Sequence, residues 1–330
     1  MRLCCCPTVD AAALYYRPLR RQNTVGLPPA TGRMASRCSS AALQAAVDAI
    51  GRANAMLIAA GAGMGVDSGL PDFRGPQGFW RAYPALERLG LRFQDTSNPR
   101  LFHEDPELVW GFFIHRYQLY RKTRPHAGFQ MLKEWADRKT QGAFVFTSNV
   151  DGQFQEAGFD PMAIVECHGS LFHLQCTLPC SQSSIWPAGD ALNDVVVDSK
   201  TMRVSEDVLP RCPSCQRLAR PNVLMFGDHA WRSDIVDAQV SRFYKWQRSC
   251  RDDPDLQMVI LEIGAGTAVP TVRLECDAVL SRTNYSSGHY QRRCHLIRIN
   301  PNDNRDTGRD VTCIELPCFE ALQQIQALLS

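Results

Sequence analysis

The fold of this chain is decided by the stretch Ala55-Met56-Leu57-Ile58-Ala59-Ala60-Gly61-Ala62-Gly63-Met64-Gly65. Six consecutive apolar residues predict a strand buried on both faces, and the glycines after them predict a tight turn into a helix. In a doubly wound sheet the ligand crevice lies at such strand ends, where glycines allow backbone N–H groups to approach a pyrophosphate. The third glycine of the common dinucleotide fingerprint would fall at Val66, so a plain strand-to-helix turn stays an alternative.

Five later apolar runs have the length of strands, and helical patterns separate several of them. The runs span residues 143–147, 163–166, 258–263, 295–299 and 311–315, and the helical patterns span about 41–51, 105–121, 127–139, 267–281 and 318–329. Strands that alternate with helices predict an α/β fold with a parallel sheet covered on both faces.

Two stretches interrupt this alternation and predict an inserted small module. Residues 75–125 are helix-rich and aromatic, and residues 171–220 carry four closely paired cysteines. We therefore expect one large sheet domain made of residues 41–74, 126–170 and 221–330, into which the helical part and the cysteine-bearing part of the module are inserted.

The four cysteines form two close pairs, Cys176 with Cys180 and Cys212 with Cys215. Thiolates three or four positions apart can bind one Zn²⁺ from one side, and a second pair completes the tetrahedron. Four protein ligands leave no open coordination position, so the sequence predicts one structural zinc ion. Two disulfides are the alternative, but 14 cysteines without a secretory apolar segment favour a reducing compartment.

Composition argues against some classes of function. The chain has 330 residues and a formal net charge of +2, so no strong field indicates direct nucleic-acid binding or a membrane surface. No stretch reaches the ~20 apolar residues of a membrane span. Residues 1–40 carry six arginines and one acidic residue, and we expect a disordered tail or a mitochondrial transit peptide there. The expected location is therefore the cytoplasm or nucleus, with the mitochondrial matrix as the alternative.

Polar residues and a second glycine loop follow later strands. Gly264-Ala265-Gly266 follows the run that ends at residue 263, and Ser148, Asn149 and Asp151 follow the run that ends at residue 147. Two glycine loops at two strand ends favour a nucleotide site. Asp151 as a plain helix cap stays open.

Two more groups of residues stand out. Asp72, Phe73 and Arg74 follow a Ser-Gly-Leu-Pro turn, and His168 lies beside one of the predicted strand ends. Arg74 as a surface charge and His168 as a core histidine are the structural alternatives.

Taken in order, these segments resemble the sirtuin family of NAD-dependent protein lysine deacylases. The resemblance covers about residues 41–325 and rests on the ordered set. The matching segments are Gly61-Ala62-Gly63, residues 68–75, residues 147–152, His168-Gly169, both cysteine pairs, residues 221–227 and Ile299-Asn300-Pro301. The resemblance implies a large Rossmann-like domain and a small module that combines a zinc ribbon with helices, with NAD and the acyl-lysine protein substrate meeting in the cleft between them.

The resemblance also implies roles for the polar residues. Asn149 would orient the nicotinamide ribose and a bound water, and Asp151 would hold the nicotinamide carboxamide. His168 would act as general base on a ribose hydroxyl, which then attacks the acyl carbon. The implied products are free lysine, nicotinamide and O-acyl-ADP-ribose.

The same resemblance divides the remaining residues between cofactor and peptide. The cofactor contacts implied are Gly61, Ala62, Gly63, Asp72, Phe73, Arg74, Ser148, Gly264, Ala265, Gly266 and Asn300, with Phe73 shielding the reacting carbon from water. Val223, Phe226 and Gly227, together with the stretch after His168, would sandwich the peptide substrate as an added β-strand.

Three segments depart from the family pattern. The family usually has serine at the position of Gly65, glutamine at that of Ser148, and Gly-Thr-Ser at that of Gly264-Ala265-Gly266. Each change removes a side-chain hydrogen bond to NAD, of about 0.5–1.5 kcal/mol. Because the catalytic residues are present, we expect an active enzyme with altered cofactor contacts.

Phe113 and Arg116 are the candidate residues of the acyl pocket. Family members that remove succinyl or malonyl groups have Tyr-x-x-Arg on the helix after the cofactor loop, and the counterpart here is Phe113-Ile114-His115-Arg116, without the tyrosine hydroxyl. We expect Arg116 to be a solvated helix charge, and hence an apolar pocket for acetyl or longer neutral chains. An Arg116 that points into the pocket would favour acidic acyl groups instead.

Other functions would use the same NAD site. ADP-ribosyl transfer to a protein side chain does not require His168 as base, and an NAD-sensing scaffold requires no turnover. A hydride-transferring dehydrogenase is disfavoured, because nothing beside the crevice suggests a substrate redox group and the four-cysteine site is closed.

Overall fold

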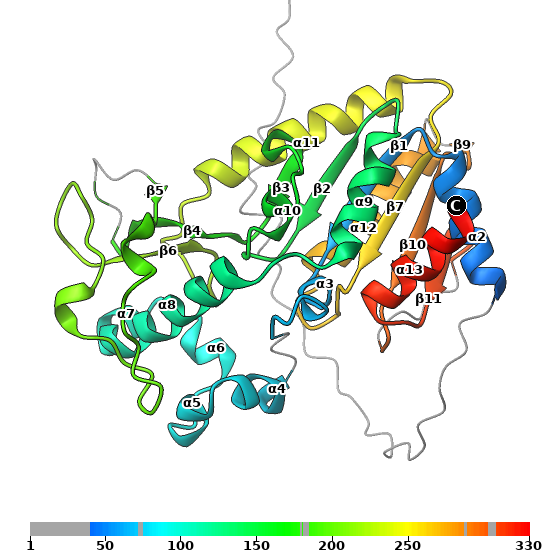
Figure 1. Cartoon of the computed structure of the whole chain (residues 1–330). Coiled ribbons are helices and arrows are strands. Elements are labelled where there is room, and N and C mark those ends of the chain that lie inside the picture. Colours follow the sequence, from blue (N-terminus) through cyan, green and yellow to red (C-terminus); the bar gives the residue numbers. More distant parts are fainter. Residues whose placement is uncertain (1–39, 72–74, 179, 181–184, 287–288, 303–307) are drawn as a thin grey trace, which may run out of the picture. The chain divides into compact units, whose positions relative to one another are not determined.

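Figure 1 shows the computed structural model of the chain, which describes residues 40–71, 75–178, 180, 185–286, 289–302 and 308–330. The arginine-rich segment predicted to be a tail and the predicted cofactor residues Asp72, Phe73 and Arg74 lie outside the described residues. The described residues all belong to the unit Cys38–Ser330.

A six-stranded parallel sheet confirms the predicted α/β class. Its strand order is β11-β10-β7-β1-β2-β3, and every neighbouring pair is parallel. The strands are β1 (Ala55–Ala60), β2 (Ala143–Thr147), β3 (Ile164–Glu166), β7 (Met258–Ile263), β10 (Cys294–Ile299) and β11 (Val311–Ile314). All six predicted strands are confirmed, because strands buried on both faces leave long apolar runs in the sequence.

Helices cover both faces of this sheet (Figure 1). On one face α2 (Ser40–Arg52), α9 (Ala127–Asp137) and α13 (Cys318–Leu329) enclose an aliphatic cluster that includes Ile58 and Leu261. On the other face lie α11 (Asp234–Asp252), whose Phe243 packs on Phe144 with ring centroids 5.3 Å apart, and α12 (Thr271–Asn284), which packs on β7 and β10.

Helix α11 has no counterpart among the predicted helices. Its 19 residues bury Val236, Gln239, Val240, Phe243, Gln247 and Cys250. These positions have helical spacing, but two of them are glutamines, so the apolar pattern is interrupted. The predicted helix 267–281 begins four residues late, at Thr271, because the glycine loop continues as far as Pro270.

The small module combines short helices with a small antiparallel sheet of strand order β5-β4-β6. Its elements are α4 (Gly75–Ala82), α5 (Pro84–Arg88), α6 (Phe93–Thr96), α7 (Leu101–Glu104), α8 (Pro106–Lys122), β4 (Gly169–Cys176), β5 (Trp186–Pro187), η2 (Asp190–Leu192), η3 (Glu206–Val208) and β6 (Ala219–Val223). An aromatic cluster of buried residues, among them Phe79, Trp110 and Phe112, fills its interior.

Short elements complete the fold. They are α3 (Gly63–Val66), α10 (Gln153–Glu156), η1 (Pro161–Ala163), β8 (Tyr285–Ser286) and β9 (His289–Tyr290). Strand β4 crosses the predicted boundary between residues 170 and 171, and β6 crosses the one between 220 and 221. The proposed division into domains therefore stays a prediction.

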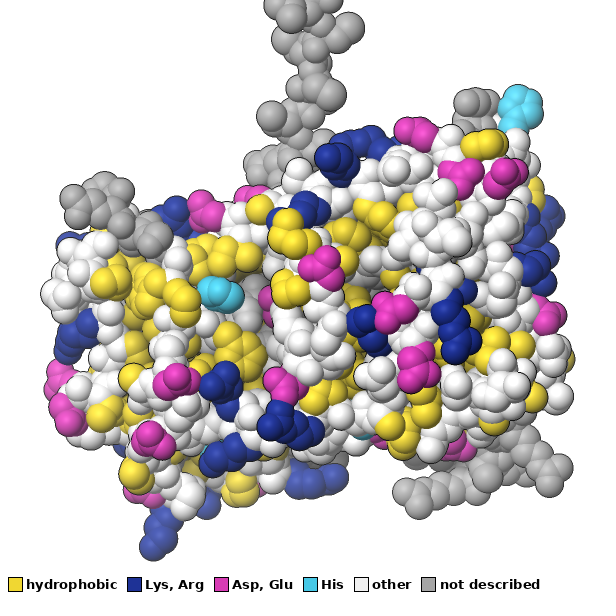
Figure 2. Space-filling model, turned by 45° about the horizontal axis from the view of Figure 1, so that its top comes forward, with side chains coloured by type: hydrophobic (Ala, Val, Ile, Leu, Met, Phe, Trp, Pro, Cys, Tyr) yellow, Lys and Arg dark blue, Asp and Glu magenta, His cyan; other side chains and the backbone are white. Residues whose placement is uncertain are grey.

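The surface carries mixed charges. In Figure 2 basic and acidic side chains are interspersed over the face shown. Among the helices of the described residues, none combines the length and the apolar character that crossing a membrane requires.

Candidate functional site

The two glycine loops meet at the carboxyl edge of the sheet. Strands β1 and β7 are neighbours, and the chain runs outward from them in opposite directions, which makes this the switch point where α/β sheets bind ligands. A Cβ on Gly61 would lie 2.7 Å from the Ala265 Cα, and one on Gly264, whose φ is +63°, would lie 2.6 Å from the Gly63 backbone. Glycine is required at both positions because the loops interlock.

A cavity of about 480 Å³ opens at this switch point. Its lining includes most of the predicted cofactor and catalytic residues: Gly61, Ala62, Ser148, Asn149, Asp151, His168, Gly264, Ala265 and Gly266. Residues that are far apart in the sequence therefore share one cavity, as the parallel sheet requires, since the carboxyl ends of its strands lie along one edge.

Two predicted cofactor residues lie behind the cavity wall. The Gly63 N–H donates to the Gly264 carbonyl at 3.1 Å and so links the two loops. The Asn300 side chain is fully buried, and its Nδ2 donates to the Ala265 carbonyl at 2.8 Å. In this structure both residues hold the glycine loops, and Asn302 lines the cavity instead.

The turn after β2 fixes Asn149. Thr147 Oγ1 donates to the Ala60 carbonyl at 3.0 Å and accepts from the Asn149 N–H at 3.0 Å. Asn149 Nδ2 donates to the Gly61 carbonyl at 3.1 Å, which orients its side-chain amide in the cavity wall.

His168 follows β3 and is half-buried in the cavity wall. Burial lowers the pKa of His168 to about 4, against the opposing effect of a hydrogen bond with the Ser148 backbone. Its Nε2 lies 3.2 Å from Thr271 Oγ1, at the start of α12. The imidazole is therefore neutral near pH 7 and has the protonation state of a base.

Asp151 is a buried carboxyl in the same wall. Burial raises the pKa of Asp151 to about 6, while the Gln153 N–H, 3.1 Å from Oδ1, and the charge of Arg116 favour ionisation. The carboxyl is mainly ionised near pH 7 and can accept hydrogen bonds from an amide.

The expectation that Arg116 is solvated is wrong. Its side chain is only 5% exposed and lines the cavity, with the guanidinium carbon 5.4 Å from the ring centroids of Phe112 and Tyr120. Nε and Nη2 donate to the Tyr120 hydroxyl at 3.2 and 2.8 Å. The reason is that this face of α8 packs against the aromatic cluster and α6, whose Phe93 also faces the guanidinium.

Phe113, the other candidate residue of the acyl pocket, lies in the aromatic core and is not among the described residues that line the cavity. It is 1% exposed and stacks on Phe102 with ring centroids 5.7 Å apart. Among the described residues that line the cavity, the hydroxyl nearest to Arg116 comes from Tyr120, one helical turn later.

Val223, Phe226 and Gly227 lie on and after β6. Val223 pairs with Gly169, and the Leu224 N–H donates to the His168 carbonyl at 2.9 Å. The two stretches expected to sandwich a peptide are thus hydrogen-bonded to each other here, which leaves no room for a strand between them. Phe226 lines the cavity just beyond, and Gly227 adopts a φ of +69°.

A buried ion pair fixes the turn that carries Phe226. Arg220 and Asp228 are bonded to each other with side chains 1% and 0% exposed. Arg220 Nη2 also donates to the Val223 carbonyl at 3.0 Å, and Asp228 Oδ2 accepts from the Met225 N–H at 3.3 Å. These bonds fold the chain back after β6 and direct it toward the cavity.

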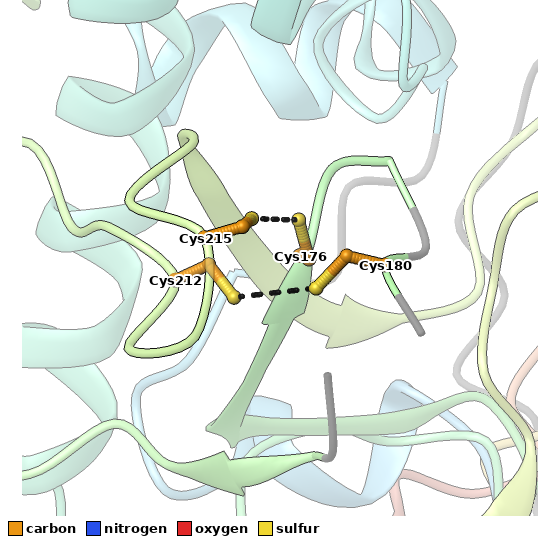
Figure 3. Close-up of side chains that lie close together, drawn as sticks. All are labelled: Cys176, Cys180, Cys212 and Cys215. Atoms are coloured by element: carbon orange, nitrogen blue, oxygen red, sulfur yellow. Dashed lines mark hydrogen bonds between the residues drawn. The ribbon is translucent and has the colours of Figure 1, made fainter. Parts of the chain in front are cut away.

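The four predicted zinc ligands converge (Figure 3). The sulfurs of all four lie within 4.8 Å of one another, with Cys176 and Cys215 3.7 Å apart and Cys180 and Cys212 3.9 Å apart. Thiolates around Zn²⁺ at about 2.3 Å lie about 3.8 Å apart, whereas a disulfide bond is about 2.05 Å long. The donor set and its spacing fit a tetrahedral zinc ion and do not fit the disulfide alternative.

Sequence reasoning missed Tyr120 and Thr271. The signal for Tyr120 was its position four residues after Arg116, on the same face of one helix. The signal for Thr271 was a hydroxyl at the first position of the helix that follows the second glycine loop.

The chain is similar in sequence to known proteins. The model of the Sir2 family matches residues 61–244. The chain is 35% identical over 198 residues to the NAD-dependent protein deacylase sirtuin-5, mitochondrial, of Danio rerio, and 31% identical over 189 residues to an NAD-dependent protein deacylase of Thermococcus kodakarensis. Each alignment covers 57% of this chain, and they cover 61% and 66% of the two relatives. The chain thus matches less than two thirds of their length.

Solved structures show the same fold. A Sir2 homologue in complex with ADP-ribose is 22% identical, with a TM-score of 0.58 over 87% of this chain and 97% of the other. A solved structure on the structural basis of sirtuin substrate affinity has a TM-score of 0.60 at 18% identity, covering 87% of this chain and 99% of the other. With the family match spanning more than half of the sequence, the chain belongs to the Sir2 family.

Proposed function

We propose that this protein is an NAD-dependent protein lysine deacylase. NAD, acyl-lysine and water would yield free lysine, nicotinamide and O-acyl-ADP-ribose. One observation carries the proposal: Asn149, Asp151 and His168 line a single cavity together with both glycine loops. The names of the relatives from Danio rerio and Thermococcus kodakarensis support it.

The side chains suit this reaction. Asp151, ionised near neutrality, would accept the nicotinamide carboxamide, and Asn149 would hold the ribose beside the Gly61 carbonyl. His168, neutral at pH 7, would take the proton of a ribose hydroxyl. Thr271 Oγ1, 3.2 Å from Nε2, marks where a hydroxyl can lie against that nitrogen.

The test compares substitutions at two histidines, one in the cavity wall and one outside it. His168→Asn should lower the rate of deacylation by about 10²- to 10⁴-fold, the usual contribution of a general base, while ADP-ribose still binds. His173→Asn, on β4, is the matched control and should keep most of the activity. Mass spectrometry would look for O-acyl-ADP-ribose. Modified protein in its place would favour ADP-ribosyl transfer, and unchanged NAD would favour a scaffold.

We also propose an acidic acyl substrate such as succinyl-lysine. Arg116 is the cationic side chain among the described residues that line the cavity. Because the Tyr120 hydroxyl accepts hydrogen bonds from Arg116, its own hydrogen can point toward a carboxylate. Tyr120, one turn after Arg116 on α8, would thus supply the hydroxyl that Phe113, one turn before it, lacks.

Acyl selectivity is tested by matched peptides. The ratio of kcat/KM for succinyl-lysine to that for acetyl-lysine should fall about 10- to 100-fold in Arg116→Gln and less in Tyr120→Phe. Arg121→Gln, whose side chain pairs with Asp190 at the surface, should leave the ratio unchanged. A wild type that prefers acetyl-lysine would remove Arg116 from substrate recognition.

The remaining proposals concern zinc, peptide and location. Cys176, Cys180, Cys212 and Cys215 would hold one structural Zn²⁺. A peptide would add as a strand beyond the pairing of β4 with β6, beside residues 225–227, where it would replace the Ser97 carbonyl that accepts from the Phe226 N–H at 2.9 Å. The Danio rerio relative is named as a mitochondrial protein, which favours the mitochondrial matrix over the cytoplasm or nucleus as the location of this chain. Imaging of a fluorescent-protein fusion with and without residues 1–40 would decide between these locations.

A further inference from the structure

A charged network lies between the sheet and α12, in a place where packing alone needs only apolar residues. Glu262 and Arg298 are paired positions on β7 and β10, and their side chains are 1% and 3% exposed. Glu262 Oε1 accepts from Arg298 Nε at 2.9 Å and from Arg273 Nε at 3.1 Å. Asp277, one turn after Arg273 on α12, accepts from Arg298 Nη2 at 2.8 Å.

The burial of these charges does not by itself stabilise the fold. Removing ions from water costs several kcal/mol each, and apolar residues of similar volume often stabilise a fold as well or better. Two residues earlier on the same face of the same strands, Ile260 and Leu296 are fully buried. The network therefore calls for a role other than packing.

The network reaches the second glycine loop. Arg273 Nη2 donates to the Ala265 carbonyl at 3.2 Å, and Asn300 Nδ2 donates to the same oxygen at 2.8 Å. In a planar trans peptide the carbonyl and the following N–H point in opposite directions. Because Arg273 and Asn300 bind the Ala265 carbonyl, the Gly266 N–H points away from these two side chains, and both residues of this peptide line the cavity.

Backbone hydrogen bonds hold Gly264, the first residue of this loop: its N–H donates to the Ile299 carbonyl at 2.9 Å and its carbonyl accepts from the Gly63 N–H at 3.1 Å. Residues 264–266 carry no hydroxyl, which enters the loop with Thr267, and the glycines that flank Ala265 make rotation of the Ala265–Gly266 peptide inexpensive. A donor from outside the loop, such as Arg273, that holds the Ala265 carbonyl would supply a constraint that the side chains of residues 264–266 do not give. Glu262 in turn fixes the guanidinium of Arg273, since the two also form an ion pair.

We propose that Arg273 is a positioning residue that turns the Ala265–Gly266 peptide so that its N–H binds a phosphate of the dinucleotide. The inference deepens the proposed function and rests on NAD being the ligand of this cavity. Backbone N–H groups arranged around a cavity are a common phosphate site. The three departures from the family pattern would then be offset in part from behind the loop.

Binding and turnover of Arg273→Met are the direct test. We expect the Kd for ADP-ribose and the KM for NAD to rise about tenfold, with kcat within about twofold of wild type, since the loss is one of ground-state binding. Arg273→Lys should recover part of the affinity. Arg282→Met, on the same helix and paired with Glu275, should bind as wild type.

A triple variant separates positioning from stability. Glu262→Met with Arg273→Met and Arg298→Met removes three charges of the network together and leaves the half-exposed Asp277, so the protein should unfold at an equal or higher temperature while still binding ADP-ribose about tenfold more weakly. Wild-type affinity in the triple variant, or a wild type that does not bind ADP-ribose, would overturn the proposal. A wild type that does not deacylate, but binds ADP-ribose about tenfold more tightly than Arg273→Met, supports this inference and rejects the proposed activity.

Discussion

The two hydrophobic clusters of the molecule are built in different ways. The sheet cluster joins aliphatic side chains of α2, α9 and α13 to strands whose parallel ladders run without interruption from β11 to β3. The cluster of the small module is richer in aromatic residues, and the small sheet beside it includes a strand of two residues, β5. The segment between β5 and β6 contains two non-glycine residues with positive φ, Met202 and Gln216.

This difference indicates that the two regions owe their order to different causes. A continuous parallel sheet with helices on both faces buries enough apolar surface to be stable by itself. A region of short strands and irregular chain needs a local constraint, and four converging thiolates can supply it through a metal ion. Variants that perturb one region at a time measure how independent the two regions are.

Metal removal should have the largest effect. A structural zinc site contributes about 10–16 kcal/mol of binding free energy that is also folding free energy. Cys212→Ser should therefore release zinc and disorder residues 171–220, with deacylation lost, while β1 and β7 stay protected from hydrogen exchange. Cys313→Ser, on β11, is the control and should keep its zinc. Equal loss of protection in both regions would show a single cooperative unit.

A pair of glycine substitutions should give the next largest effect. A Cβ on Gly111, within α8, would lie 2.0 Å from the Met202 carbonyl oxygen, whereas one on Gly51, in α2, would meet nothing within 4 Å. Gly111→Ala should destabilise the protein by about 1–3 kcal/mol through forced repacking. Gly51→Ala should stabilise it by about 0.5–1 kcal/mol. Urea unfolding of both variants measures the contrast, and equal changes would contradict the close approach in the module.

The smallest effect concerns the border between the regions, where β3 ends and β4 begins. Burial raises the pKa of Glu166 to about 7, above the ~4.3 of an unfolded chain. Between these values the folded state binds more protons, so this group lowers stability as pH rises. Glu166→Gln should therefore gain stability relative to wild type, on the order of 1 kcal/mol, between pH 5 and 8. The exposed control Glu87→Gln should follow the wild-type curve, and parallel curves for both variants would contradict burial of Glu166.

The same contrast explains what the sequence could predict. Strand β1 is buried at every residue, so its position in the sequence is visible as an apolar run. The site residues after β1, β2, β3 and β7 follow, because parallel strands bring their carboxyl ends to one edge. Helix α11 was missed because Gln239 and Gln247 occupy its buried face.

The orientation of Arg116 could not be predicted in this way. Its position on α8 depends on which face the aromatic cluster and α6 cover, and these contacts join segments that have no periodic pattern. The placement of Asn300 behind the loop is similar, because the distinction between a ligand contact and a loop contact is a matter of a few ångströms.

The buried indole of Trp110 has an optical consequence. Its Nε1 donates to the Ala219 carbonyl at 3.1 Å, on the strand that follows the second cysteine pair, and the ring is 1% exposed. Trp135, in the sheet region, donates instead to Gln326 at 2.6 Å. Since a dry indole emits at shorter wavelength than a wet one, the emission of Trp110 can report the state of the cysteine cluster in a variant whose other tryptophans except Trp135 are replaced by phenylalanine, with Trp135 as the reference whose emission stays constant.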